Sequence, residues 1–223
     1  MTRNIARSFP AALALLTWAH NMPVARGQNL QPAPSHLLLM GDQTKPPIGW
    51  QVFCRRYEAE CHHRYPLGAA ITFNNKNWNI LVDVNKTVNG FIKPAADIDH
   101  WGIIDQWDIP TAKDPRGDCE DYVLKKRHIL IEEHGFPAPA LLPAIVRDKD
   151  GTGHAVLLAR TDRGDVVLDN QQKEILTWPQ SFKTMQYKPV KALSPENEKI
   201  WLEAWRTLEE MRVAQVAFSS PAP

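Results

Sequence analysis

A length of 223 residues suits one substantial domain or two small ones, and a hydrophobic fraction of 43% is ordinary for a globular protein. The formal net charge is +1 and lysine and arginine form no basic stripe, so we do not expect nucleic acid as a partner. Eighteen prolines and eight tryptophans indicate a loop-rich protein with large anchoring side chains.

The first part of the chain, residues 1–27, has the pattern of a secretory signal peptide. Two arginines precede an apolar run over residues 9–19, and Ala25 and Gly27 offer a cleavage point. The run is too short to span a bilayer as a stable helix, and no other segment is apolar enough to cross one. We therefore expect export, with a leader in a cytosolic protein as the alternative. Residues 28–47, rich in Pro and Gln and without periodicity, are expected to form a linker.

The cysteines divide into a close pair and a distant single residue. Because Cys54 and Cys61 are separated by six residues in a chain expected to be exported, a disulfide is the leading interpretation. His62 and His63 follow directly, which makes a Cys/His metal site the alternative, although zinc sites usually space their paired ligands more tightly. Two paired cysteines leave Cys119 as the odd thiol, as a nucleophile requires.

Apolar residues at helical spacing predict a core-facing helix over residues 76–92. Asn85 and Asn89 lie on or beside its apolar stripe, where they either brace a neighbouring loop or serve as buried structural amides. A long loop over residues 97–115 follows and contains two tryptophans. Their side chains either form the floor of a substrate groove or anchor the loop to the core.

A second helix is predicted to begin at Cys119. Asp118 is the expected N-cap, and Asp121 sits where its carboxylate can reach back to the first turn. The unpaired N–H groups of a helix start favour a thiolate and can donate to a developing oxyanion. With Glu120, three carboxylates flank the sulfur and would raise the pKa of the thiol, so either an imidazolium or a bound cation must offset them.

Three strands are predicted after this helix, at residues 141–147, 154–161 and 165–170. In an antiparallel hairpin, the residue numbers of directly opposed residues always add to the same value. Two residues on the two strands have their side chains on the same face when their numbers add to a value of the same parity as that constant. A two-residue turn at Asp162-Arg163 therefore puts His154 and Asp169 on the same face as diagonal neighbours, within side-chain reach. A three-residue turn without a bulge would put them on opposite faces.

Cysteine, histidine and carboxylate occur in the order that a thiol nucleophile needs. Cys119 begins a helix, His154 opens a later strand, and Asp169 ends the strand after that. Each residue alone is more often an ordinary core, surface or turn residue. Their joint order is what predicts nucleophilic chemistry at the thiol.

Three separated motifs share their order and spacing with a known family. The motifs are Gly117-Asp118-Cys119-Glu120-Asp121-Tyr122, Gly153-His154-Ala155-Val156-Leu157 and Gly164-Asp165-Val166-Val167-Leu168-Asp169-Asn170. Further matching residues upstream are Val84-Asn85, Asn89, Trp101-Gly102, Asp105 and Trp107. Over roughly residues 50–178 the sequence resembles the bacterial transglutaminase-like cysteine proteinase family, which includes the LapG-type periplasmic proteases.

The resemblance implies an α+β fold of the papain-like or transglutaminase-like kind, in which the catalytic helix packs on an antiparallel sheet. It implies a triad in which Cys119 is the nucleophile, His154 the general base and acid, and Asp169 the residue that orients the imidazole. These roles agree with the chemistry of a thiol nucleophile, since the imidazole takes the thiol proton and the carboxylate stabilises the charged ring.

The resemblance also implies calcium beside the nucleophile. LapG-type enzymes bind Ca²⁺ there, and the similar positions in this chain are Asp118, Glu120 and Asp121. Hard oxygen ligands suit Ca²⁺, and such a cation would offset the carboxylates around the sulfur. The alternative is that these acids merely cap the helix.

The family domain is expected over residues 48–193, with a C-terminal helix and tail over residues 194–223. Ser194-Pro195-Glu196 is a helix-start signature, after which apolar residues repeat at helical spacing. These residues are Ile200, Trp201, Ala204, Trp205, Leu208 and Met211. We expect this helix to pack back onto the domain, with docking of a partner as the alternative.

The expected function is a periplasmic cysteine endopeptidase that cleaves amide bonds of a surface or periplasmic protein through a thioester intermediate. No integral membrane segment is expected after removal of the signal peptide. An amidase or a transglutaminase-type acyl transferase on the same scaffold is the first alternative, because only the acceptor, water or amine, separates it from a peptidase. A non-catalytic periplasmic binding module is the second alternative.

Overall fold

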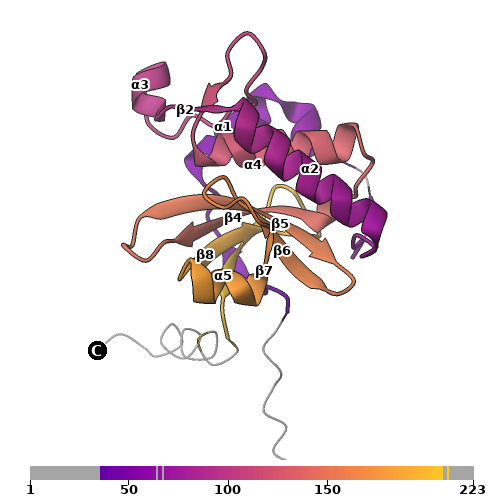
Figure 1. The fold of residues 1–223 in the computed structure, drawn as a ribbon. Helices are drawn as coiled ribbons and strands as arrows, with labels where there is room; N and C mark the ends of the chain where they lie inside the picture. Colours follow the sequence, from indigo (N-terminus) through magenta and orange to yellow (C-terminus); the bar gives the residue numbers. More distant parts are fainter. Residues whose placement is uncertain (1–35, 64, 67, 208–209, 211–223) are drawn as a thin grey trace, which may run out of the picture. The chain divides into compact units, whose positions relative to one another are not determined.

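The computed structural model of this chain describes residues 36–63, 65–66, 68–207 and 210 (Figure 1). The expected signal peptide at residues 1–27, the first part of the expected linker and the end of the expected tail lie outside the described residues. Within the described part of the chain, no helix combines the length and the apolar character needed to cross a bilayer.

The described residues form a seven-stranded antiparallel sheet in the strand order β1-β9-β8-β4-β5-β6-β7. The bounds are β1 (Leu39–Thr44), β4 (Leu141–Arg147), β5 (Gly153–Thr161), β6 (Gly164–Leu168), β7 (Leu176–Thr177), β8 (Lys188–Leu193) and β9 (Trp201–Trp205). A separate parallel pair joins β2 (Lys93–Pro94) to β3 (Arg116–Gly117). The fold is therefore α+β with an antiparallel sheet, as the resemblance implied.

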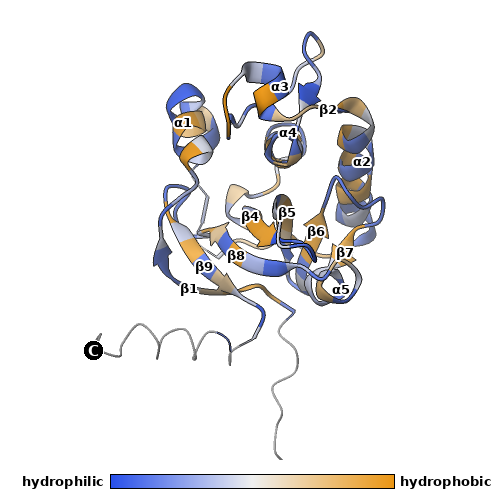
Figure 2. Cartoon of the chain, turned by 90° about the vertical axis from the view of Figure 1, so that its left-hand side faces the viewer, coloured by the Kyte–Doolittle hydropathy of each residue, from blue (hydrophilic) through white to orange (hydrophobic). Residues whose placement is uncertain are grey.

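Helices cover both faces of this sheet (Figure 1). Those with fully described bounds are α1 (Ile48–Arg56), α2 (Asn75–Phe91), α3 (Asp97–Trp101), α4 (Cys119–Glu132) and α5 (Trp178–Thr184), with short 3-10 helices η1 (Glu58–Cys61) and η2 (Ala138–Ala140). Helix α4 packs on β5 and against α2, whereas α5 packs on β6 and β7. The view in Figure 2, turned by 90°, shows α2 and α4 on one side of the sheet and α5 close to β7.

Strand β5 is apolar on both faces because both are covered. Ala155 and Leu157 belong to the core cluster that α2 and α4 share with the sheet. Val156 and Leu158, which alternate with them, belong to the cluster that contains Trp178 of α5. A continuous apolar run is what a strand buried on both faces requires, and this strand carries the site residues described below.

The predicted helices and strands of the central region are confirmed. The helix expected over residues 76–92 is α2, and the helix expected to begin at Cys119 is α4, with Asp118 as its N-cap residue. The three expected strands correspond to β4, β5 and β6, with ends that differ by no more than two residues.

Two parts of the predicted domain organisation are wrong. Residues 39–44, within the expected linker at 28–47, form β1, and residues 201–205, within the expected C-terminal helix at 194–223, form β9. The two strands pair with each other and β9 also pairs with β8, so both segments belong to the sheet. These long-range backbone hydrogen bonds outweigh the helical spacing of the apolar residues. The C-terminal segment does pack back onto the domain, although as a strand.

Buried tryptophans pin the segment before β3 to the core. Trp107 is 2% exposed, and its ring lies edge-on to Trp50 at 5.8 Å and to Trp201 at 6.1 Å between ring centroids. Trp101 is 42% exposed and takes no part in this cluster. Of the two alternatives, pinning is therefore confirmed for Trp107.

The disulfide predicted between Cys54 and Cys61 is present, with Cα atoms 5.6 Å apart. It joins the last turn of α1 to η1 and excludes these two sulfurs from a metal site. The neighbouring histidines have other partners, since His62 Nδ1 lies 2.8 Å from the carbonyl oxygen of Glu58 and the backbone N–H of His63 donates to Glu198. Cys119 is the free thiol of the described residues.

We predict that Trp201→Ala lowers the free energy of unfolding by about 3–5 kcal/mol, the cost of truncating a large buried aromatic side chain. Trp201 is fully buried against Trp50 and Trp107. Urea unfolding followed by circular dichroism measures the change. The exposed Trp101→Ala is the matched control and should lose less than about 1 kcal/mol. Equal stability of Trp201→Ala and the wild type would show that β9 is not part of the core.

Candidate active site

Cys119 is the first residue of α4, and the turn before it is tightly built. The Asp121 carboxylate accepts the backbone N–H of Asp118 at 3.3 Å and that of Asp108 at 2.7 Å. Gly117 approaches Asp121 so closely that a Cβ on the glycine would lie 2.7 Å from the Asp121 Cβ. A side chain at position 117 would therefore displace Asp121, whose carboxylate accepts the backbone N–H of the N-cap residue Asp118.

His154 and Asp169 are joined by a buried hydrogen bond. Nε2 of His154 lies 2.9 Å from Oδ1 of Asp169, and the two residues are 4% and 2% exposed. Thr161 pairs with Gly164, so the turn between β5 and β6 has two residues, as the register argument required. The prediction that the two side chains share a face is confirmed.

The environment of Asp169 defines the tautomer of His154. Burial opposes ionisation of the carboxyl, but the hydrogen bonds from His154, Tyr187 and Gln171 outweigh it and lower the pKa of Asp169. An ionised carboxylate can only accept, so Nε2 of His154 carries the proton and Nδ1 of the neutral ring is an acceptor. The side-chain amide nitrogen of Gln171 lies 3.5 Å from Nδ1, at the limit of a hydrogen bond.

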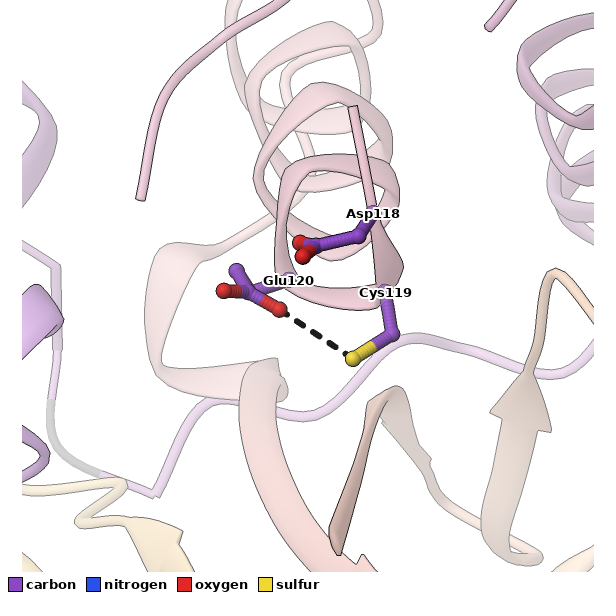
Figure 3. A group of neighbouring side chains, drawn as sticks. All are labelled: Asp118, Cys119 and Glu120. Atoms are coloured by element: carbon purple, nitrogen blue, oxygen red, sulfur yellow. Dashed lines mark hydrogen bonds between the residues drawn. The ribbon is translucent and has the colours of Figure 1, made fainter. Parts of the chain in front are cut away.

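The thiol lies beside the strand of His154 but is not hydrogen-bonded to the imidazole. The backbone N–H of Ala155, the next residue, interacts with the Cys119 sulfur. Among the described residues, the hydrogen-bond partner of the thiol is Glu120, whose Oε2 accepts from Sγ at 3.1 Å (Figure 3). Proton transfer from Cys119 to His154 therefore requires the thiol to leave Glu120.

The surroundings of the thiol favour its protonated form. Burial raises the pKa of Cys119, and the charge and the hydrogen bond of Glu120 raise it further, whereas the Ala155 N–H lowers it. Burial, followed by the neighbouring Asp118, raises the pKa of Glu120 itself to about 9. The opposition between the carboxylates and the helix start, expected from the sequence, is thus present in the structure.

Acidic side chains gather around the start of α4. Ligand atoms of Asp118, Cys119 and Glu120 lie within 4.8 Å of one another, and so do those of Asp97, Asp118 and Asp121. Asp97 is 4% exposed and Asp121 fully buried, and burial raises the pKa of both, that of Asp121 to about 8. Asp118 belongs to both groups, so the acids form one continuous cluster.

Asp97 is the member of this cluster that sequence reasoning missed. It begins α3, and the parallel pairing of β2 with β3 brings it to the start of α4, where the Ala95 N–H donates to the Gly117 carbonyl at 3.1 Å. A two-residue parallel strand pair has no recognisable sequence pattern. The available signal was the aspartate itself, close upstream of the acidic motif.

The acidic cluster has the chemistry of a hard-cation site. Oδ1 of Asp97 and Oδ1 of Asp118 are buried and have no hydrogen-bond partner within the described residues. Buried carboxylate oxygens normally find a donor or a cation, and carboxylate oxygens are the ligands that Ca²⁺ prefers. Capping explains Asp121, whose oxygens accept backbone N–H groups, but it leaves these two oxygens of Asp97 and Asp118 without a partner.

Comparison with known families agrees with this arrangement. The family described as bacterial transglutaminase-like cysteine proteinase, BTLCP, matches residues 40–209, which is most of the chain. The chain belongs to this family and is a cysteine peptidase of the transglutaminase-like type. The match extends beyond residues 50–178, where the motifs suggested it, and reaches into both β1 and β9.

Solved structures of LapG from Legionella pneumophila are similar to this chain. The match to the calcium-bound form has 25% sequence identity and a TM-score of 0.47, and it covers 56% of this chain and 68% of the LapG chain. The match to the EGTA-treated form has 26% sequence identity and a TM-score of 0.45, and it covers 56% of this chain and 66% of the LapG chain. No curated protein sequence matches the chain.

We predict that Glu120→Gln makes the Cys119 thiol more reactive at pH 10 in the presence of EGTA, since this pH lies above the pKa of about 9 of Glu120 and the carboxylate is ionised. The substitution removes the charge that, after burial, most raises the pKa of the thiol. Alkylation by iodoacetamide, followed by mass spectrometry, should be about tenfold faster, as expected when the thiolate gains ~1.4 kcal/mol. Glu132→Gln, in the last turn of α4, is the control and should react at the wild-type rate. An unchanged rate in Glu120→Gln would mean that this carboxylate does not control the thiol.

Proposed function

We propose that this chain is a periplasmic cysteine endopeptidase that cleaves an amide bond of a protein substrate. In this proposal Cys119 is the nucleophile, His154 the general base and acid, and Asp169 the residue that orients the imidazole. The observation that carries the proposal is the buried hydrogen bond of 2.9 Å between His154 and Asp169, with the free thiol at the start of α4 beside the same strand. Family membership supplies the reaction class.

The first half of the reaction forms a thioester. Nδ1 of His154 takes the thiol proton, the sulfur of Cys119 attacks the amide carbonyl carbon, and the carbonyl electron pair moves onto oxygen. The backbone N–H of Cys119, the first residue of α4, is suited to donate to that oxyanion. The imidazolium, stabilised by Asp169, then protonates the amide nitrogen as the C–N bond breaks.

The second half of the reaction returns the enzyme to its starting state. A water molecule attacks the thioester carbon while His154 takes one of its protons, and the C–S bond breaks as that proton returns to sulfur. The product is a carboxylic acid. A primary amine in place of water would give a new amide, so the acceptor alone separates hydrolysis from acyl transfer.

Export to the periplasm is part of the proposal. The disulfide between Cys54 and Cys61 supports it, because disulfides persist in oxidising compartments. The signal-peptide pattern of residues 1–27 supports it independently. A surface or periplasmic protein is therefore the proposed class of substrate.

We predict that Cys119→Ala and His154→Ala keep the fold and lose cleavage. The test incubates each purified protein with a cell-surface and periplasmic extract from a strain that lacks the gene. New protein N-termini, found by mass spectrometry with the wild type only, support the peptidase. Incorporation of dansylcadaverine without new N-termini would replace it by an acyl transferase. Equal cleavage by wild type and Cys119→Ala would remove Cys119 from the mechanism.

We propose further that Asp97, Asp118, Glu120 and Asp121 hold Ca²⁺. The support is the cluster itself, in which two buried carboxylate oxygens have no partner among the described residues and burial raises the pKa of three of the four groups. When bound, the cation would supply positive charge that favours ionised carboxylates and a thiolate. The charge of the cation would act on Cys119 through Glu120 and on helix α3 through Asp97.

We predict that Ca²⁺ stabilises the protein through this cluster. At a Ca²⁺ concentration of 100 times the dissociation constant, the gain of about 2.7 kcal/mol should raise Tm by roughly 5–10 °C. Differential scanning fluorimetry with Ca²⁺ and with EGTA measures it. Asp97→Asn should remove most of the shift, whereas Asp99→Asn, an exposed neighbour in the same helix, should keep it. An equal Tm of the wild type in Ca²⁺ and in EGTA would exclude the site.

A further inference from the structure

Both oxygens of the Asp169 carboxylate have fixed donors. Oδ1 accepts from His154 Nε2 and from the backbone N–H of Gln171, each at 2.9 Å. Oδ2 accepts from the hydroxyl of Tyr187 at 2.5 Å. The backbone carbonyl of Asp169 accepts from Asn89 of α2 at 2.8 Å, so the residue is held from several segments.

Tyr187 reaches this carboxylate from a different part of the sheet. It lies directly before β8, which is separated from β6 by β4 and β5. Gln186, the preceding residue, has a φ of 55°, in the left-handed region that non-glycine residues seldom adopt. Tyr187 is 1% exposed, and its ring centroid lies 5.7 Å from that of His154. The tyrosine therefore contacts both members of the pair.

We propose that Tyr187 is a positioning residue of the active site, whose hydroxyl holds the Asp169 carboxylate in the orientation that presents Oδ1 to His154. The inference rests on the proposed function of His154 and Asp169. A carboxylate bound through one oxygen alone can turn about its Cβ–Cγ bond, whereas donors on both oxygens fix its plane. The sequence gives no indication of this role, because Tyr187 lies outside the three motifs.

The hydroxyl is suited to this task because it stays neutral. Burial raises the pKa of Tyr187, and the charge of Asp169 raises it further, so the group donates throughout the neutral range. A neutral donor orients the carboxylate and leaves its charge available to the imidazolium. Lys126 of α4 is 1% exposed, and burial lowers its pKa to about 7 although the charge of Asp169 opposes this shift.

Two readouts at fixed pH test the proposal on Tyr187→Phe, which removes the hydroxyl and keeps the ring. The first is the rate of Cys119 alkylation by iodoacetamide at pH 7 with Ca²⁺ present, which we expect to fall about tenfold, the size of one lost hydrogen bond to a charged group. The second is the proton NMR resonance of His154 Nε2–H, assigned by its absence in His154→Ala, which should shift and broaden.

Tyr57→Phe is the matched control. The Tyr57 hydroxyl also donates to an aspartate, Asp108 Oδ1 at 2.6 Å, but it contacts neither His154 nor Asp169. We expect this variant to keep the wild-type rate and resonance. A loss in Tyr57→Phe as large as in Tyr187→Phe would reduce the effect to general destabilisation and overturn the proposal, as would a wild-type rate and resonance in Tyr187→Phe.

The His154→Ala variant distinguishes a failure of the proposed role of Tyr187 from a failure of the proposed function. A slow rate in His154→Ala with a wild-type rate in Tyr187→Phe would overturn the role of Tyr187 and leave the proposed function standing. An alkylation rate that does not change in His154→Ala would instead remove the imidazole from the chemistry of Cys119. The proposed function would then fail before the question of Tyr187 arises.

Discussion

The hydrogen bond between His154 and Asp169 depends on the length of a single turn. Thr161 pairs with Gly164, and this pair sets the register of every other pair along β5 and β6, because the residue numbers of each pair add to the same value. One residue more in this turn would move Asp169 to the other face of the sheet, where no imidazole could reach it. Thr161 supports the short turn directly, because its hydroxyl donates to the Gly164 carbonyl and accepts from the Arg163 N–H.

The start of α4 combines two opposite electrostatic demands. A helix N-terminus favours a thiolate, but Cys119 is buried and its hydrogen-bond acceptor is the carboxylate of Glu120. The neighbouring carboxylates of Asp118 and Asp121 cap the helix, and Asp121 also holds the segment before it, since it accepts the backbone N–H of Asp108. The acids are therefore structurally required even though they oppose ionisation of the sulfur. A cation bound in the cluster would offset these negative charges, which is the physical reason to expect one here.

The sequence was informative wherever the signal was local. The N-cap at Asp118, the apolar stripe of α2 and the turn at residues 162–163 each lie within a few residues, and all three are confirmed. The disulfide was predictable for the same reason, since its cysteines are close in the chain.

Prediction from the sequence failed where contacts between two segments far apart in the chain determine the local conformation. Trp201 and Ala204 are both buried, and a spacing of three residues fits a helix as well as an irregular strand. Their conformation is set by pairing with β1, which includes a register shift between Met40 and Gln43 and begins more than 150 residues earlier. Asp97 was missed for a related reason, because β2 and β3 bring it to α4 and neither strand has a pattern of its own.

An ion-pair network explains why the C-terminal segment matters to the helix that carries the thiol. Arg127 of α4 is 1% exposed and donates to the carbonyls of Leu141 and Glu60 and to the carboxylate of Glu198. Glu198 lies between β8 and β9 and also accepts the backbone N–H of His63, two residues after the disulfide.

A buried guanidinium is tolerated only when its donors are satisfied, and it imposes one arrangement on the groups that satisfy it. Burial opposes ionisation of Glu198, but the hydrogen bonds from His63 and the charge of Arg127 outweigh it and lower the pKa of the carboxyl. The pair therefore stays ionised and ties α4 to the β8–β9 connection. Because Cys119 and Arg127 lie in the same helix, this ion pair also anchors the element that carries the sulfur to the β8–β9 connection.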